Sequence, residues 1–126
     1  MKKLLLPLFI LTQFVFADPP GWQDNPGGYE FIASMIPMVY INGEVAGEEG
    51  DLLGAFGPDG SMRGVGTRLI IPFGPNAGLY TFDIQLRSNA ASDVLTFQFY
   101  DASDDTYYDA DPSENYPWFD FGFNIS

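Results

Sequence analysis

Apolar and polar residues alternate along three segments of the chain, and this alternation is its clearest structural pattern. The segments are Tyr80–Arg87, Leu95–Phe99 and Phe119–Ile125. Successive side chains of a β-strand point to opposite faces of a sheet, so every second residue of such a segment faces a core while the others face water. The pattern predicts three half-buried strands.

Four further segments have the composition of strands, and two turn sequences accompany them. They are Tyr29–Met35, Met38–Ile41, Leu52–Phe56 and Met62–Ile71. Pro37 is expected to bend or break the chain after the first of them. Asn42-Gly43 follows the second and favours the positive φ angles of a tight turn. Gly57-Pro58-Asp59-Gly60 has Pro and Gly at the positions that a type I turn prefers, which predicts a hairpin between the third and fourth.

The fold class follows from the spacing of these strands. No stretch shows the three-and-four spacing of an amphipathic helix over more than two turns. Gly and Pro, 14 and 10 residues, interrupt the chain at intervals that suit short strands. The expected fold is all-β, an antiparallel two-sheet β-sandwich of the immunoglobulin or jelly-roll kind with about 7–8 strands.

The first 17 residues have the three parts of a secretory signal peptide. Lys2 and Lys3 precede the apolar stretch Leu4–Phe16, and Val15 and Ala17 are small residues at the positions that signal peptidase prefers. The apolar stretch is shorter than the roughly 20 residues of a membrane-spanning helix. No Cys stands at the cleavage point, so a lipoprotein anchor is not expected. The chain is therefore predicted to be secreted, to the cell surface or beyond it, with no membrane span.

Cleavage after residue 17 would leave a Pro/Gly-rich segment, 18–28, and one β-sandwich domain, 29–126. It would remove both lysines and leave three arginines against 17 acidic residues, a net charge of −14. A surface of that charge repels nucleic acid and anionic membranes. Cys is absent, so the fold must rest on a packed core. The chain has 12 Phe, 7 Tyr and 2 Trp, and three of the Phe, at positions 9, 14 and 16, belong to the leader.

Five blocks of sequence, in order, resemble a module of secreted and surface-associated bacterial proteins. They are Gly50–Phe56, Met62–Gly66, Phe73–Gly78, Leu86–Ala91 and Leu95–Ala102. The first two correspond to a D-x-L-x-A-F…R-G-V pattern, and the last two to R-S-N-A…L-T-F-x-x-Y-D-A. The resemblance covers about residues 29–125. It implies an extracellular β-sandwich of unassigned activity, often attached to larger proteins, whose relatives continue with one more short extended segment after the position of Asn124.

The first block also has a physical interpretation of its own. Asp51 precedes one strand of the predicted hairpin and Arg63 lies on the other, so the two are expected to pair as a structural clasp. An arginine that receives an acidic ligand is the weaker alternative, because so many acidic residues surround it. Gly64 and Gly66 are expected to permit close packing or a bulge.

Catalytic chemistry is largely excluded by composition. The chain has no His and no Cys, which removes Ser-His-Asp and Cys-His centres, the usual zinc sites and thiol redox chemistry. A glycosidase needs only two carboxylates, and Asp83, Asp101 or Asp120 would be available. These acids fit better on the wet face of a strand or in a turn, so the chain is predicted not to be an enzyme.

An acidic segment from Asp101 to Glu114 is the best candidate for metal binding. Hard cations such as Ca²⁺ take several carboxylate and carbonyl oxygens at once. The spacing is not that of an EF-hand and indicates an irregular, turn-rich loop. Ca²⁺ is the predicted cofactor, with Asp101, Asp104, Asp105 and Asp109 as ligands. A smaller acidic group around Glu48 is expected to be a wet loop.

Aromatic residues outside the regular strands are candidates for ligand contact, since exposed rings stack on sugar faces in many binding modules. Trp118, with Tyr107 or Tyr108, is the predicted binding surface.

Two functions remain open. One is a non-enzymatic adhesion or recognition module for glycan or protein on a cell surface or matrix, stabilised by calcium. The other is a self-associating subunit of an extracellular fibre or matrix, in which a free segment 18–28 is donated to a neighbour's sheet edge.

Overall fold

A computed structural model of the chain describes residues 20–90, 92–112 and 123–125. The regular structure within these ranges consists of strands: β1 Phe31–Met35, β2 Val39–Ile41, β3 Glu44–Ala46, β4 Leu52–Phe56, β5 Met62–Ile70, β6 Tyr80–Ser88, β7 Thr96–Asp101, β8 Thr106–Pro112 and β9 Phe123–Ile125. In this part of the chain no helix is present that is long and apolar enough to cross a membrane. The predicted leader, Trp118, Asp120 and the first half of the predicted last strand lie outside the described residues.

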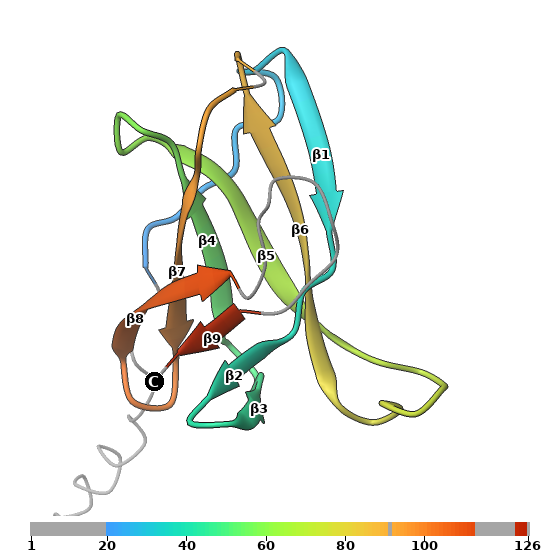
Figure 1. Ribbon diagram of the computed structural model, residues 1–126. Coiled ribbons are helices and arrows are strands. Elements are labelled where there is room, and N and C mark those ends of the chain that lie inside the picture. The colour runs from blue at the N-terminus through green and yellow to red at the C-terminus, as the bar shows by residue number, and fades with distance from the viewer. Residues whose placement is uncertain (1–19, 91, 113–122, 126) are drawn as a thin grey trace, which may run out of the picture.

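The strands form a hydrogen-bonded ladder in the order β1-β6-β5-β4-β7-β8-β9-β2-β3. All neighbours are antiparallel except β2 and β9, which run parallel. β8 passes from one layer to the other: its residues 106–110 pair with β7, in the layer of β1, β6, β5 and β4, and its Asp111 and Pro112 pair with β9, in the layer of β2 and β3 (Figure 1). The predicted all-β sandwich is confirmed, and the described residues contain nine strands, three of them only three residues long.

The three residues between β1 and β2 bring the two ends of this ladder together. β1 lies at one margin and β2 lies next to the other, yet the chain passes directly between them. Pro37 is the pivot: its carbonyl accepts the backbone N–H of Phe82 at 3.0 Å and the hydroxyl of Thr81 at 2.6 Å. The predicted bend at Pro37 is therefore anchored on β6, and it carries the chain from one layer to the other.

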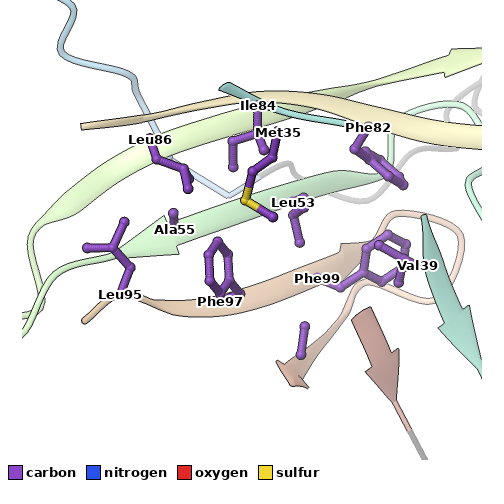
Figure 2. Packing of buried hydrophobic residues seen from close by; sticks show 11 residues of the cluster. Met35, Val39, Leu53, Ala55, Phe82, Ile84, Leu86, Leu95, Phe97 and Phe99 are labelled. Atoms are coloured by element: carbon purple, nitrogen blue, oxygen red, sulfur yellow. The ribbon is translucent and has the colours of Figure 1, made fainter. Parts of the chain in front are cut away.

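The core lies between the two layers and follows the alternation in the sequence. Phe82, Ile84 and Leu86 of β6 point inward and are buried, while Asp83 and Gln85 between them are exposed. Phe97 and Phe99 of β7 face them, and the rings of Phe82 and Phe99 meet edge to face at 5.6 Å (Figure 2). The other members are Met35, Val39, Leu53, Ala55, Leu95 and Ala110. Because this cluster consists of apolar side chains, hydrophobic burial is the main source of its stability.

Two predicted turns and two predicted glycine roles are also present. At the turn between β4 and β5 the N–H of Gly60 donates to the carbonyl of Gly57 at 2.9 Å. Asn42 and Gly43 have φ angles of 53° and 85°, as a two-residue turn between β2 and β3 requires. A side chain at Gly64 would collide with the backbone of β6, and one at Gly66 would lie 2.8 Å from the Cβ of Ile84. These two glycines let β5 pack closely against β6.

The acidic segment that was expected to be an irregular loop is different. It forms a hairpin in which residues 102–105 turn between β7 and β8, and Thr106–Pro112 is a strand. The expectation was wrong because acidic residues mask a period-two pattern. Ala110 is buried while Asp109 and Asp111 on either side of it are exposed.

Candidate binding face

Strands β4, β7 and β8 present a second surface on the side opposite the core, which we call the outer face. Cross-strand pairing places Gly54, Gln98 and Asp109 in one row, and Leu52, Tyr100 and Tyr107 in the next. Phe56 pairs with Thr96 in the row on the other side. The outer face therefore combines aromatic rings with hydroxyl, amide and carboxylate groups on rigid strands. This combination is common at sites that bind polar ligands with flat apolar faces.

The segment 20–30, which we call the strap, packs along this layer of the sheet. Its Trp22 lies on Gly54, where an added Cβ would come within 2.9 Å of the indole ring. The indole meets the ring of Phe56 at 5.6 Å and that of Tyr107 at 5.8 Å, both edge to face. The absence of a side chain at Gly54 thus makes room for a line of three rings. We call Phe56, Trp22 and Tyr107 the aromatic row.

An ion pair fixes the strap farther along. Both carboxylate oxygens of Asp24 accept hydrogen bonds from the guanidinium of Arg87, from Nε and from one terminal nitrogen, each at 2.7 Å. The Arg87 side chain is almost fully buried and that of Asp24 is about one-third exposed. The hydrogen bonds from Arg87 hold the pKa of Asp24 below its ordinary value, against a smaller opposing effect of burial. The expectation that 18–28 is free is wrong for residues 20–28.

The predicted clasp between Asp51 and Arg63 is also wrong. Leu52, next to Asp51, pairs with Thr67, whereas Arg63 lies at the turn end of the same hairpin, roughly 13 Å away at about 3.3 Å per residue. The guanidinium of Arg63 instead donates to Asp93 at 3.1 Å and stacks on the ring of Tyr29 at 4.9 Å. Arg63 therefore holds the far end of the strap and the loop before β7.

Asp51 has a different structural role from the one expected. One oxygen accepts the backbone N–H of Ala102 at 2.9 Å, and the other accepts that of Glu48 at 2.6 Å. The side chain is buried, and this burial raises the pKa of Asp51 above its ordinary value, although the two backbone hydrogen bonds oppose the shift. Asp51 thereby joins the loop before β4 to the β7–β8 turn, so the Glu48 region is not simply a wet loop.

A pocket of about 470 Å³ opens beside the aromatic row. Its polar lining consists of Thr96, Gln98, Asp109 and Asp111. Phe56 and Phe97 are the aromatic residues of the lining. Gln98 Nε2 donates to Asp109 Oδ1 at 3.4 Å, so the amide and one carboxylate are already oriented toward each other. Hydrogen-bonding groups held in this way beside aromatic rings would suit the hydroxyls and apolar faces of a sugar.

The four predicted calcium ligands are not brought together. Asp101 accepts both the backbone N–H and the hydroxyl of Ser103, and Asp105 accepts the hydroxyl of Tyr100 at 2.8 Å. Asp109 lies farther along β8, beside Gln98. Among the described residues no group of three or more acidic side chains converges as a metal site would require. The carboxylates of the turn serve instead to stabilise it, and calcium binding stays a prediction.

The three aromatic residues predicted to bind a ligand do not lie together on the outer face in the part of the chain that the structure describes. Tyr107 is 47% exposed and belongs to the aromatic row. Tyr108, the next residue of the strand, points to the opposite side and packs against the core. Trp118 lies outside the described residues. The sequence interpretation missed Phe56, Gln98 and Asp111, because their place beside Tyr107 depends on strand pairing. Gly54 was the available signal, since a glycine inside a strand marks a close approach by another group.

Comparison with protein-family models, with curated proteins and with solved structures found no match for this chain. The resemblance to a secreted bacterial module therefore stays a prediction, and the functional argument rests on the outer face itself.

Proposed function

We propose that this protein is an exported, non-catalytic recognition module that binds glycan on its outer face. The observation that carries the proposal is the aromatic row of Phe56, Trp22 and Tyr107, which lies beside a pocket whose polar groups come from adjacent strands. Sugar rings have apolar faces that stack on aromatic side chains and hydroxyls that need paired donors and acceptors. The outer face offers both on a scaffold of paired strands.

A binding role suits these residues better than a catalytic one. A hydrolase with two carboxylates needs them in different environments, so that one stays protonated while the other is ionised. Asp109 and Asp111 are both exposed on the same face of one strand, and so share one environment. The other carboxylates considered for catalysis are no better suited to it. Asp83 is exposed on β6, and Asp101 accepts a hydrogen bond from the hydroxyl of Ser103 in the β7–β8 turn.

The alternative of a fibre subunit assembled by strand complementation has less support. Its donated piece was to be the segment 18–28, and residues 20–28 would have to leave the contacts of Trp22 and the ion pair of Asp24 with Arg87. Release of Asp24 would leave the buried guanidinium of Arg87 without its carboxylate partner, which is costly.

The experiment is a glycan array followed by calorimetric titration of the glycans that bind, with and without EDTA. We expect Tyr107→Ala and Gln98→Ala each to weaken binding about tenfold, because each removes one contact of about 1.4 kcal/mol. Phe73→Ala is the matched control, since Phe73 is an exposed aromatic residue in the connection between β5 and β6 and is not part of the outer face. Absence of binding by the wild-type protein, or equal effects of all three variants, would contradict the proposal. Loss of binding in EDTA would support the calcium component.

A further inference from the structure

The hairpin between β5 and β6 extends beyond the body of the sandwich (Figure 1, yellow-green to yellow). We call residues 69–80 the finger. No charged residue occurs between Arg68 and Asp83, in a chain with a net charge of −12. Phe73 near the tip is 79% exposed, and Leu79 on the returning arm is exposed as well. An uncharged, apolar projection on so acidic a protein marks a contact surface rather than a solubility feature.

The apolar side chains of the finger point in more than one direction. Leu69 and Ile70 are consecutive residues of β5 and so face opposite sides of the hairpin, yet they are 43% and 56% exposed. A groove on a partner protein would cover one side and leave the other in water. An apolar medium that surrounds the finger, as lipid does, would cover both.

The backbone of the finger is also suited to an apolar medium. At its base the N–H of Ile71 donates to the carbonyl of Leu79, and the N–H of Gly78 donates to that of Ile71, both at 2.9 Å. Nearer the tip, Ala77 donates to Gly74 at 3.1 Å. Backbone groups that are paired internally avoid most of the cost of leaving water, which is what restricts structures that enter lipid.

The base of the finger carries the residue types that settle at a lipid–water boundary. Arg68 stacks over the ring of Tyr80 at 4.9 Å and donates to the carbonyl of Gly47 at 3.5 Å. Tyr and Arg place an apolar part toward lipid and a polar end toward water. From Leu69 to Phe73 the chain spans roughly 13 Å at about 3.3 Å per residue, enough to pass the headgroups to the acyl boundary.

We propose that the finger inserts into the surface of a zwitterionic lipid bilayer. The charge of the domain selects this lipid class, because an anionic surface and a second copy of the acidic chain are both repelled, whereas phosphatidylcholine carries no net charge. The proposal is independent of glycan binding, since the finger and the outer face share no residue.

Flotation of the exported protein with unilamellar phosphatidylcholine vesicles tests the assignment. Phe73→Ser should reduce the fraction bound at least tenfold. Val94→Ser is the matched control, because Val94 is 70% exposed but lies in the loop before β7, and it should bind as the wild type does. Replacing about 30% of the lipid with phosphatidylglycerol should weaken binding several-fold at about 20 mM salt and have little effect at about 500 mM, where charges are screened.

Three results would overturn the proposal. The wild-type protein could fail to float with phosphatidylcholine, Phe73→Ser could bind normally, or Val94→Ser could lose binding to the same extent. Gel filtration tests whether the finger instead contacts a second copy of the chain. A wild-type dimer that Phe73→Ser converts to a monomer would assign the finger to that contact. Thermal melting of both variants should match the wild type, since both side chains are exposed, which excludes unfolding as the cause of lost binding.

Discussion

The two sides of the β4–β7 layer are stabilised in different ways. The inner side packs apolar side chains that alternate along each strand, such as Phe82 against Phe99. The outer side is covered by the strap, which is attached by ring contacts of Trp22 and by the ion pair of Asp24 with Arg87. The inner contacts depend on non-directional burial, whereas the outer contacts depend on a few specific geometries. The difference implies that the inner side determines whether the chain folds, and the outer side determines which surface it presents.

The largest expected effect is on the inner side. Phe82→Ala should lower the free energy of unfolding by about 3–5 kcal/mol, because it removes a fully buried ring and leaves a cavity between the layers. Urea denaturation followed by tyrosine and tryptophan fluorescence measures the change. Phe73→Ala, an exposed ring on the finger, is the control and should stay within about 0.5 kcal/mol of the wild type. Similar values for the two variants would contradict the placement of the core.

The next effect concerns the contact between the strap and the sheet. Trp22→Ala should lower the free energy of unfolding by about 2 kcal/mol, less than a buried aromatic residue because the indole is partly exposed. Trp22→Phe should recover about half of the loss. Proteolysis is the second measurement, since an undocked strap should be cleaved first near residues 20–28. An unchanged cleavage pattern in Trp22→Ala would show that the ring does not hold the strap.

The ion pair of the strap should show a dependence on acid. Because Arg87 holds the pKa of Asp24 below its ordinary value of 3.8, the stabilisation is complete above that value and is lost as the pH falls below it. Asp24→Asn should therefore cost about 1–2 kcal/mol at neutral pH, reduced from a fully buried pair by the partial exposure of Asp24. The difference from wild type should shrink toward about pH 2.5. A difference independent of pH would contradict the pairing.

The smallest expected effect has the opposite sign. Burial raises the pKa of Asp51, so its contribution to stability decreases as the pH rises above 3.8 through the raised value. Between about pH 3.5 and pH 7 the free energy of unfolding of Asp51→Asn should rise relative to that of the wild type. The total change in this difference should be below about 1 kcal/mol. Urea denaturation of this variant and of Asp24→Asn across the same range makes the comparison direct. Parallel pH profiles of stability for the two variants would contradict either the lowered pKa of Asp24 or the raised pKa of Asp51.

The inner side could be predicted from the sequence because its signal is local. The strand Leu52–Phe56 was predicted with the bounds that it has, and the buried set of β6 follows from alternation alone. β8 was missed since its inward residues, Tyr108 and Ala110, stand among acids that looked like a loop.

The outer side could not be predicted in the same way, because its contacts join residues far apart in the chain. Asp24 is 63 positions from Arg87, and Arg63 is 30 from Asp93. With 17 acidic residues and three arginines in the chain, the sequence leaves many pairings open, and the nearby candidate, Asp51, was the wrong one. Only the register of the strands decides which carboxylate each guanidinium meets.

The position of β9 sets the order in which the domain can be completed. β9 lies between β8 and β2 in the ladder, although it contains residues 123–125 and β2 contains residues 39–41. Residues 123–125 are synthesised after β2 and β8, so the facing edges of β2 and β8 stay unpaired until synthesis has reached Ile125. A chain truncated before Phe123 would retain both edges permanently and should aggregate through them.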